Sequence, residues 1–177
     1  MSNICQDCLA NLPILTQQCP RCAEPNVHGE VCGHCLSLPP AFDGVICPYE
    51  YKVPVNQLIH QWKHHAHTLG PELLSQQLFT KLEATQFDYV VPVPYHWIKL
   101  LKRGHNPVRN LSRQLAKQLS TPLLDAIIRV EKGQDQRGLN RKSRLKNLKK
   151  AFAFNKKKQE IVKGKNILLV DDVLTTG

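Results

Sequence analysis

Apolar residues recur at helical spacing in three stretches of the chain, and each stretch predicts an amphipathic helix. The stretches begin at about Val55, at Pro71 and at about Pro107, and the second of them extends to Ala84. Asn106 precedes the third stretch, and asparagine is a preferred residue at helix N-caps. The hydrophobic pattern therefore predicts three helices with one apolar face each.

Shorter apolar runs predict strands between and after these helices. The runs cover residues 45–53, 87–94, 126–130, 151–154 and 167–170. The last run consists of four consecutive branched apolar residues, which is typical of a central parallel strand buried on both faces. A basic, glycine-containing segment, 96–106, separates the second run from the third helix and is predicted to be a loop.

Two carboxylates and a hydroxyl-rich turn follow the last predicted strand. Ligands of open α/β sheets bind beyond the carboxyl ends of the strands, so Asp171 and Asp172 are expected to project into such a crevice. In the turn, Thr175 and Thr176 offer hydroxyl and backbone donors, and Gly177 allows close approach of a phosphate. Because carboxylates accept hydrogen bonds from vicinal hydroxyls, this order of residues indicates a sugar-phosphate site.

Length, hydropathy and charge narrow the class of protein. The 177 residues are 42% apolar, which suits one domain of ordinary size with a small additional module. Neither a membrane-spanning apolar run nor a signal-peptide pattern is present, so we expect a cytoplasmic protein without membrane insertion. Residues 1–95 carry 4 basic and 8 acidic side chains, whereas residues 96–177 carry 20 basic and 6 acidic ones. The second half is therefore expected to attract polyanions.

Basic residues lie at two places where they can meet an anion. Lys102 and Arg103 follow the 87–94 strand and are expected near an anion at the same sheet edge as Asp171. The segment 131–150 is a basic insertion between two strands and suits a mobile lid over a pyrophosphate. The alternative is that these side chains belong to solvated loops.

Cysteines organise the first 40 residues into a predicted metal-binding module. They form three Cys-x-x-Cys pairs, namely Cys5/Cys8, Cys19/Cys22 and Cys32/Cys35. Two such pairs complete one tetrahedral Zn²⁺ site of structural type, and the surroundings of the second and third pairs are the more knuckle-like. The first pair is either half of a second site or the true partner of one of the others. A Pro-rich hinge follows at 38–44, so we expect a zinc module at 1–40 and a second domain at 41–177.

The segment 167–177 resembles the PRPP-binding loop of type I phosphoribosyltransferases throughout its length. The resemblance implies that Asp171 and Asp172 are catalytic acids that hold the ribose hydroxyls of PRPP. It also implies that the 5′-phosphate is surrounded by the loop residues Val173, Leu174, Thr175, Thr176 and Gly177. Mg²⁺ would accompany PRPP, while Lys102 and Arg103 would neutralise the departing pyrophosphate.

Several further motifs, taken in order, make most of the chain similar to the ComF/GntX family. They are the Cys-x-x-Cys pairs, PPAFD at 39–43, VPVP at 91–94, RGHN at 103–106, QxxL at 136–139, RxxN at 144–147, AF at 151–152 and the final loop. This resemblance implies a Rossmann-like type I phosphoribosyltransferase domain with flanking helices, preceded by zinc knuckles. It also implies a role in DNA uptake during natural transformation, with single-stranded DNA and DNA-uptake or recombination proteins as partners.

The sequence departs from the family pattern in ways that affect activity. The family motif RGFNQ is RGHNP here, and type I phosphoribosyltransferases continue beyond Thr-Thr-Gly with a helix and a strand. We therefore expect a phosphoribosyltransferase-like domain that is truncated after its PRPP loop and incomplete at its C-terminus. Two functions follow as hypotheses: phosphoribosyl transfer from PRPP to an acceptor with release of pyrophosphate, or single-stranded DNA binding by a non-catalytic, zinc-containing protein of the same fold.

Overall fold

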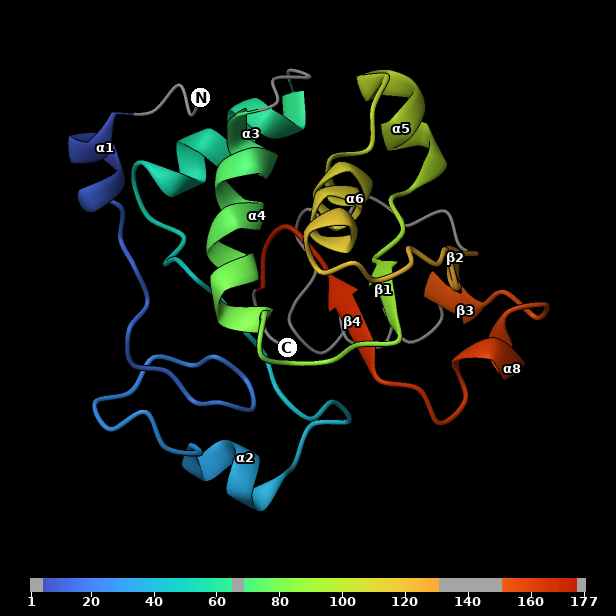
Figure 1. The fold of residues 1–177 in the computed structure, drawn as a ribbon, viewed down its shortest axis with the longest axis horizontal. Helices are drawn as coiled ribbons and strands as arrows, with labels where there is room; N and C mark the ends of the chain where they lie inside the picture. Colours follow the sequence, from blue (N-terminus) through green and yellow to red (C-terminus); the bar gives the residue numbers. More distant parts are fainter. Residues whose placement is uncertain (1–4, 65–68, 131–150, 175–177) are drawn as a thin grey trace. The chain divides into compact units, whose positions relative to one another are not determined.

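A computed structural model of the protein describes residues 5–64, 69–130 and 151–174 (Figure 1). The chain divides into two compact units: Met1–Glu83 with Asp172–Gly177 forms unit 1, and Ala84–Asp171 forms unit 2. The predicted combination of helices with a small parallel sheet is confirmed. The domain division expected at residue 40 stays a prediction. None of the helices in the described part of the chain has the length and apolar character needed to cross a membrane.

The described part of unit 1 contains four helices and an apolar cluster. The helices are α1 (Gln6–Ala10), α2 (Gly33–Ser37), α3 (Val55–His64) and α4 (Leu69–Leu82). Val55 and Ile59 of α3 pack with Leu12 and with Leu73 of α4. The helices predicted from Val55 and over residues 71–84 are therefore confirmed, because their apolar faces pack within this cluster.

The strand predicted at 45–53 is wrong. This segment has no regular strand and makes an isolated antiparallel bridge between Tyr49 and Ile14. Backbone hydrogen bonds flank the bridge, from Leu15 N to Pro48 O at 3.0 Å and from Glu50 N to Pro13 O at 2.9 Å. Prolines on both segments remove backbone donors, so a longer ladder cannot form there.

Unit 2 is built on two parallel strands. β1 (Tyr89–Pro92) pairs with β4 (Ile167–Val170), and Val90 lies opposite Leu168 in their register. Figure 1 shows the two strands side by side, with α6 (Pro107–Gln118) packed against them. The core includes residues from both strands and from α6: Val90, Val91, Val108, Leu111, Leu115 and Val170.

The beginning of α6 confirms the predicted helix and its cap. The side chain of Asn106 accepts a hydrogen bond from the backbone N–H of Arg109 at 3.0 Å. Pro107 occupies the first turn, where its missing N–H has no intrahelical partner to lose. The helix therefore begins where local chemistry favours it, directly after the segment that follows β1.

A second pair of strands is antiparallel. β2 (Ile127–Arg129) pairs with β3 (Phe152–Phe154), and the short helix α8 (Gln159–Val162) leads towards β4. These strands confirm the predictions at 126–130 and 151–154. The basic lid expected at 131–150 lies outside the described residues.

Two further expectations for unit 2 are wrong. The segment predicted as a basic loop contains α5 (Trp97–Arg103), whose N-cap is His96 and which ends at Gly104 with a φ of 71°. Gly104 N donates to Leu100 O at 2.8 Å, so a glycine in the left-handed region closes the helix. Strand β4 is not buried on both faces, because Leu169 is 55% exposed. Within the described residues β4 pairs only with β1, which leaves its other edge without a strand neighbour.

Candidate functional site

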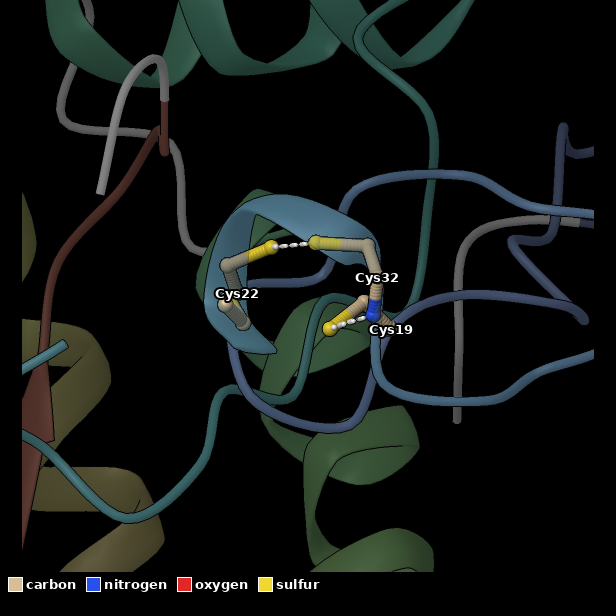
Figure 2. Close-up of side chains that lie close together, drawn as sticks. Cys19, Cys22 and Cys32 are labelled. Atoms are coloured by element: carbon tan, nitrogen blue, oxygen red, sulfur yellow. Dashed lines mark hydrogen bonds between the residues drawn. The ribbon is translucent and has the colours of Figure 1, made fainter. Parts of the chain in front are cut away.

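Four cysteine sulfurs converge in unit 1. The Sγ atoms of Cys19, Cys22, Cys32 and Cys35 all lie within 4.8 Å of one another. Cys19 and Cys35 are buried, and the other two are half-buried. The sulfurs of Cys22 and Cys32 are 3.7 Å apart, and the backbone N–H of Cys32 donates to the sulfur of Cys19 at 3.3 Å. Both contacts are drawn in Figure 2. The two Cys-x-x-Cys pairs expected to act together are therefore brought together.

Local backbone structure positions these sulfurs. Ala23 has a φ of 61°, and its N–H donates to Cys19 O at 2.8 Å, so Cys19 and Cys22 lie on a tight turn. Cys35 lies in α2, whose N-cap is Cys32. A turn and the first turn of a short helix thus each present two sulfurs to one point, as in a knuckle-type site.

The four thiols are electrostatically unequal. Burial opposes ionisation of Cys19, but backbone N–H groups of Cys32, Cys22 and Arg21 outweigh it and lower the pKa of Cys19 to about 6. Burial, together with the smaller effect of the neighbouring sulfurs, raises the pKa of Cys35 to about 12. Four thiolates in such a cluster repel one another, and a bound divalent cation offsets this repulsion.

The donor set fits a tetrahedral metal ion. Zn–S bonds of about 2.3 Å place tetrahedral sulfurs about 3.8 Å apart, and the Cys22–Cys32 distance of 3.7 Å agrees with this spacing. Four cysteines also leave no coordination position for a substrate, so the chemistry is that of a structural site. These four residues can hold a metal ion, in agreement with the expected structural zinc.

The first cysteine pair lies outside this cluster. Cys5 and Cys8 are both exposed, and Cys8 N donates to Cys5 Sγ at 3.4 Å. Among the described residues the metal-compatible group contains only the later four cysteines. The role of the first pair stays a prediction.

The carboxyl ends of β1 and β4 lie at the same edge of unit 2. Pro92 is opposite Val170 in the parallel register, and Val93 N donates to Val170 O at 2.9 Å just beyond it. Asp171 is the next residue after β4, and it is exposed. The expectation that this acid follows a parallel strand at a sheet edge is therefore consistent with the backbone geometry.

Arg103 is tied to the segment that leaves this edge after β1. Its guanidinium lies over the ring of Tyr95, 5.3 Å from the ring centroid. One guanidinium nitrogen, Nη1, is buried and has no hydrogen-bond partner among the described residues. A buried charged donor is costly to leave unsatisfied, and an anion is the natural acceptor for it. Lys102 lies beside it in sequence, on α5.

Asp172 has different surroundings from Asp171 and belongs to unit 1. Its Oδ1 lies 2.9 Å from Nζ of Lys63 on α3, and its side chain is 9% exposed. Val173 packs its side chain against the apolar cluster of unit 1, and Leu174 is exposed. The remaining loop residues, Thr175, Thr176 and Gly177, lie outside the described residues, so their phosphate role stays a prediction.

Sequence reasoning missed Lys63 as a partner of the carboxylate pair. The sequence feature that could have indicated this partner is the position of Lys63, four residues after Ile59 and eight after Val55. This spacing puts it on the buried face of α3. A lysine on an apolar face is seldom fully buried without a partner. Here the partner is an acid more than 100 residues away, which helical periodicity alone does not reveal.

Relatives of this chain are named for competence and for DNA use. Competence protein F of Haemophilus influenzae is 31% identical over 182 residues, covering 98% of this chain and 77% of the relative. DNA utilization protein YhgH of Escherichia coli K12 is 31% identical over 168 residues, covering 90% and 72%. The protein of the same name in Salmonella typhimurium is 31% identical over 189 residues, covering 98% and 79%.

No family model matches the sequence, and no solved structure matches it. The relatives, however, align over nearly the whole chain at an identity above 30%, and the cysteine cluster and the parallel strand pair both lie inside the aligned length. The chain therefore belongs to the ComF family.

Proposed function

We propose that this protein acts in DNA uptake and utilisation, and that it binds PRPP with Mg²⁺ at the carboxyl edge of β1 and β4. The names of its relatives, Competence protein F and DNA utilization protein, support the first part. The Asp-Asp and Thr-Thr-Gly residues after β4 support the second. The zinc-binding cysteine module has a structural role in this proposal.

One observation carries the PRPP proposal. The parallel pairing of β1 with β4 puts the exposed Asp171 and the start of the segment that leads to Arg103 at one edge of the same compact unit. Arg103, at the end of α5, has a buried guanidinium nitrogen without a hydrogen-bond partner among the described residues, which we take as the donor for an anion. A carboxylate can accept hydrogen bonds from the ribose hydroxyls of PRPP, and a guanidinium can bind its pyrophosphate.

The proposed reaction is displacement at C1 of the ribose. A nitrogen acceptor forms the new bond to C1 and gives up a proton, while the C1–oxygen bond breaks and its electron pair leaves with the pyrophosphate. Arg103 and Lys102 neutralise the leaving group, and Asp171 orients the ribose through its hydroxyls. Mg²⁺, when bound with PRPP, supplies further charge neutralisation at the pyrophosphate.

Calorimetric titration of PRPP in MgCl₂ tests this proposal. We expect saturable binding by the wild type and a loss of roughly tenfold or more in affinity for Asp171→Asn and for Arg103→Gln, because each removes a charge-assisted hydrogen bond. Arg113→Gln, a change to another basic residue of unit 2, is the control and should bind as the wild type does. Equal binding by all variants, or none by the wild type, would reject the site.

A second candidate function is binding of single-stranded DNA by unit 2. The observation that favours it is Trp97, which is 54% exposed on the basic helix α5. Exposed aromatic side chains among basic residues stack with nucleobases while lysines and arginines track the phosphates. Unit 2 contains 20 basic and 6 acidic side chains, which gives it the charge needed for such binding.

Intrinsic fluorescence separates this function from PRPP binding. The chain has two tryptophans: Trp97 is exposed, and Trp62 is 2% exposed. We expect an oligothymidine to quench the exposed one, with an affinity that falls steeply as salt increases. Trp97→Phe should abolish most of the quenching and weaken binding severalfold. Quenching that is unchanged in this variant would contradict a stacking role for α5.

A further inference from the structure

Two histidines lie one helical turn apart on α3. His60 and His64 are separated by four positions, so they lie on the same side of the helix, and their ring centroids are 4.5 Å apart. Both side chains are exposed. Neither residue belongs to the four-cysteine cluster. They therefore form a second group of metal-binding residue types within unit 1.

The separation of the two rings suits a shared metal ion. Metal–nitrogen bonds of about 2.1 Å put two imidazole centroids about 4.5 Å apart when the rings bind one ion at right angles. Such angles are typical of the square-planar and tetragonal coordination of Cu²⁺ and Ni²⁺, for which imidazole is a suitable ligand. Because both side chains are exposed, rotation of the rings can direct one nitrogen of each at the same ion.

The helix that carries the pair is fixed by its opposite face. Val55, Ile59 and Trp62 are buried, and Trp62 is only 2% exposed. A packed helix holds two ligands at a constant spacing, which reduces the conformational entropy lost when an ion binds. The pair is therefore better organised for chelation than two histidines on a loop would be.

The charges at this end of α3 also favour a cation. His64 is the last residue of a ten-residue helix, whose terminal carbonyl groups carry partial negative charge. Lys63 is its neighbour in the chain, and the ammonium of Lys63 lies 2.9 Å from the carboxylate of Asp172. This pairing offsets the repulsion that the lysine would exert on a metal ion.

We propose that His60 and His64 form a second metal site, which binds a divalent transition-metal ion of the nickel or copper type. Two protein donors leave the other coordination positions to water or to a further ligand, whereas the four cysteines leave none. The histidine site therefore binds its ion reversibly and has no structural role. This site does not depend on the proposed PRPP function.

The test is a titration of NiCl₂ into protein whose cysteine cluster has been loaded with Zn²⁺ and then freed of excess metal. Ni²⁺ is the probe because, unlike Cu²⁺, it does not oxidise thiols. Calorimetry should show saturable binding of one Ni²⁺ per chain, and native mass spectrometry should show nickel added to the zinc-loaded form. His60→Ala and His64→Ala should each weaken Ni²⁺ binding at least tenfold, and the double variant should lose little more, since either change leaves a single donor.

Thermal unfolding gives an independent readout of the same site. Ni²⁺ should raise the melting temperature of the wild type, because an ion that binds only the folded helix stabilises it, and should leave the two histidine variants unchanged. Without Ni²⁺ the wild type and these variants should melt together, since substitutions at exposed side chains have small effects on stability.

Two control variants remove other exposed donors. His28→Ala removes a histidine outside α3, and Cys5→Ser removes a thiol outside the cysteine cluster. Both variants should bind Ni²⁺ as the wild type does. The proposal would be overturned by an absence of Ni²⁺ uptake in the zinc-loaded wild type, by equal uptake in the histidine variants, or by a loss of uptake in Cys5→Ser.

Discussion

The two units of this protein have different sources of stability. In unit 1 a four-cysteine cluster and a small apolar cluster at α3 and α4 hold a chain that includes long irregular segments. In unit 2 the buried residues come mainly from a parallel strand pair and from α6, and include Val90, Val91, Leu111, Leu115 and Val170. The comparison teaches that metal ligation can take the place of a larger core where much of the chain is irregular and only part of its apolar surface is packed.

The units also differ in charge. Unit 1 carries 4 basic and 8 acidic side chains, whereas unit 2 carries 20 basic and 6 acidic ones. The boundary between them falls between the two adjacent acids, Asp171 and Asp172. Anion binding is therefore expected to respond to changes in unit 2, and metal binding to changes in unit 1.

Loss of the metal site should have the largest effect and should be confined to unit 1. Structural zinc sites contribute roughly 10 to 16 kcal/mol of apparent free energy, so chelation or Cys35→Ser should unfold the segment around the cluster. Hydrogen exchange should show lost protection at the amides of Ala23 and Leu36, while Leu111 keeps its protection. Native mass spectrometry reports the bound metal.

The control for this experiment is Cys5→Ser, at an exposed cysteine outside the cluster. This variant should keep one metal ion bound by the four later cysteines. Equal hydrogen-exchange protection of unit 1 with and without metal would contradict a stabilising role of the metal, because the apolar cluster alone would then hold the unit.

A core truncation in unit 2 should have the next largest effect. Leu111 is 1% exposed on α6, and Leu111→Ala should reduce the free energy of unfolding of that unit by about 2 to 5 kcal/mol through lost transfer energy and a cavity. Denaturant unfolding measures the loss, and metal content should not change. Leu101→Ala, at a side chain that is 74% exposed, should change stability by less than about 0.5 kcal/mol.

Removal of the α6 cap should have a smaller effect. Asn106→Ala removes the acceptor for Arg109 N–H, so unit 2 should lose about 1 kcal/mol of unfolding free energy. Asn106→Asp keeps an acceptor at this position and should retain most of the stability in the same denaturant measurement. If Asn106→Asp lost as much unfolding free energy as Asn106→Ala, the side chain would not stabilise α6 by accepting the hydrogen bond of Arg109 N–H.

The smallest expected effect is a pH dependence of unit 2. The backbone N–H of Asn166 and the ammonium of Lys165 lower the pKa of Asp88 below its ordinary value of 3.8. Stability from this group is therefore present above that ordinary value and is lost as pH falls through the lower folded-state pKa. Asp88→Asn should melt below the wild type at neutral pH, and the difference should vanish in strongly acidic buffer. An equal difference at both pH values would exclude titration of Asp88 as the cause.

The elements that sequence predicted well are those in which local chemistry and tertiary packing agree. The apolar face of α3 and the Asn-Pro start of α6 are local signals, and packing in each unit reinforces them. The helix α5 was missed because its basic residues suggested an anion-binding loop, although Gly104 at its end is a local stop signal.

The sequence by itself determined the three Cys-x-x-Cys pairs, the main helices, and the acids after the last strand, because each depends on residues close together in the chain. The sequence favoured the second and third cysteine pairs, and tertiary structure settled that these two share a cluster; it alone decided that β1 and β4 are partners and that Lys63 faces Asp172. Such contacts join residues separated by long stretches of chain, and their partners are selected by packing and by satisfaction of buried charge, which local periodicity does not encode.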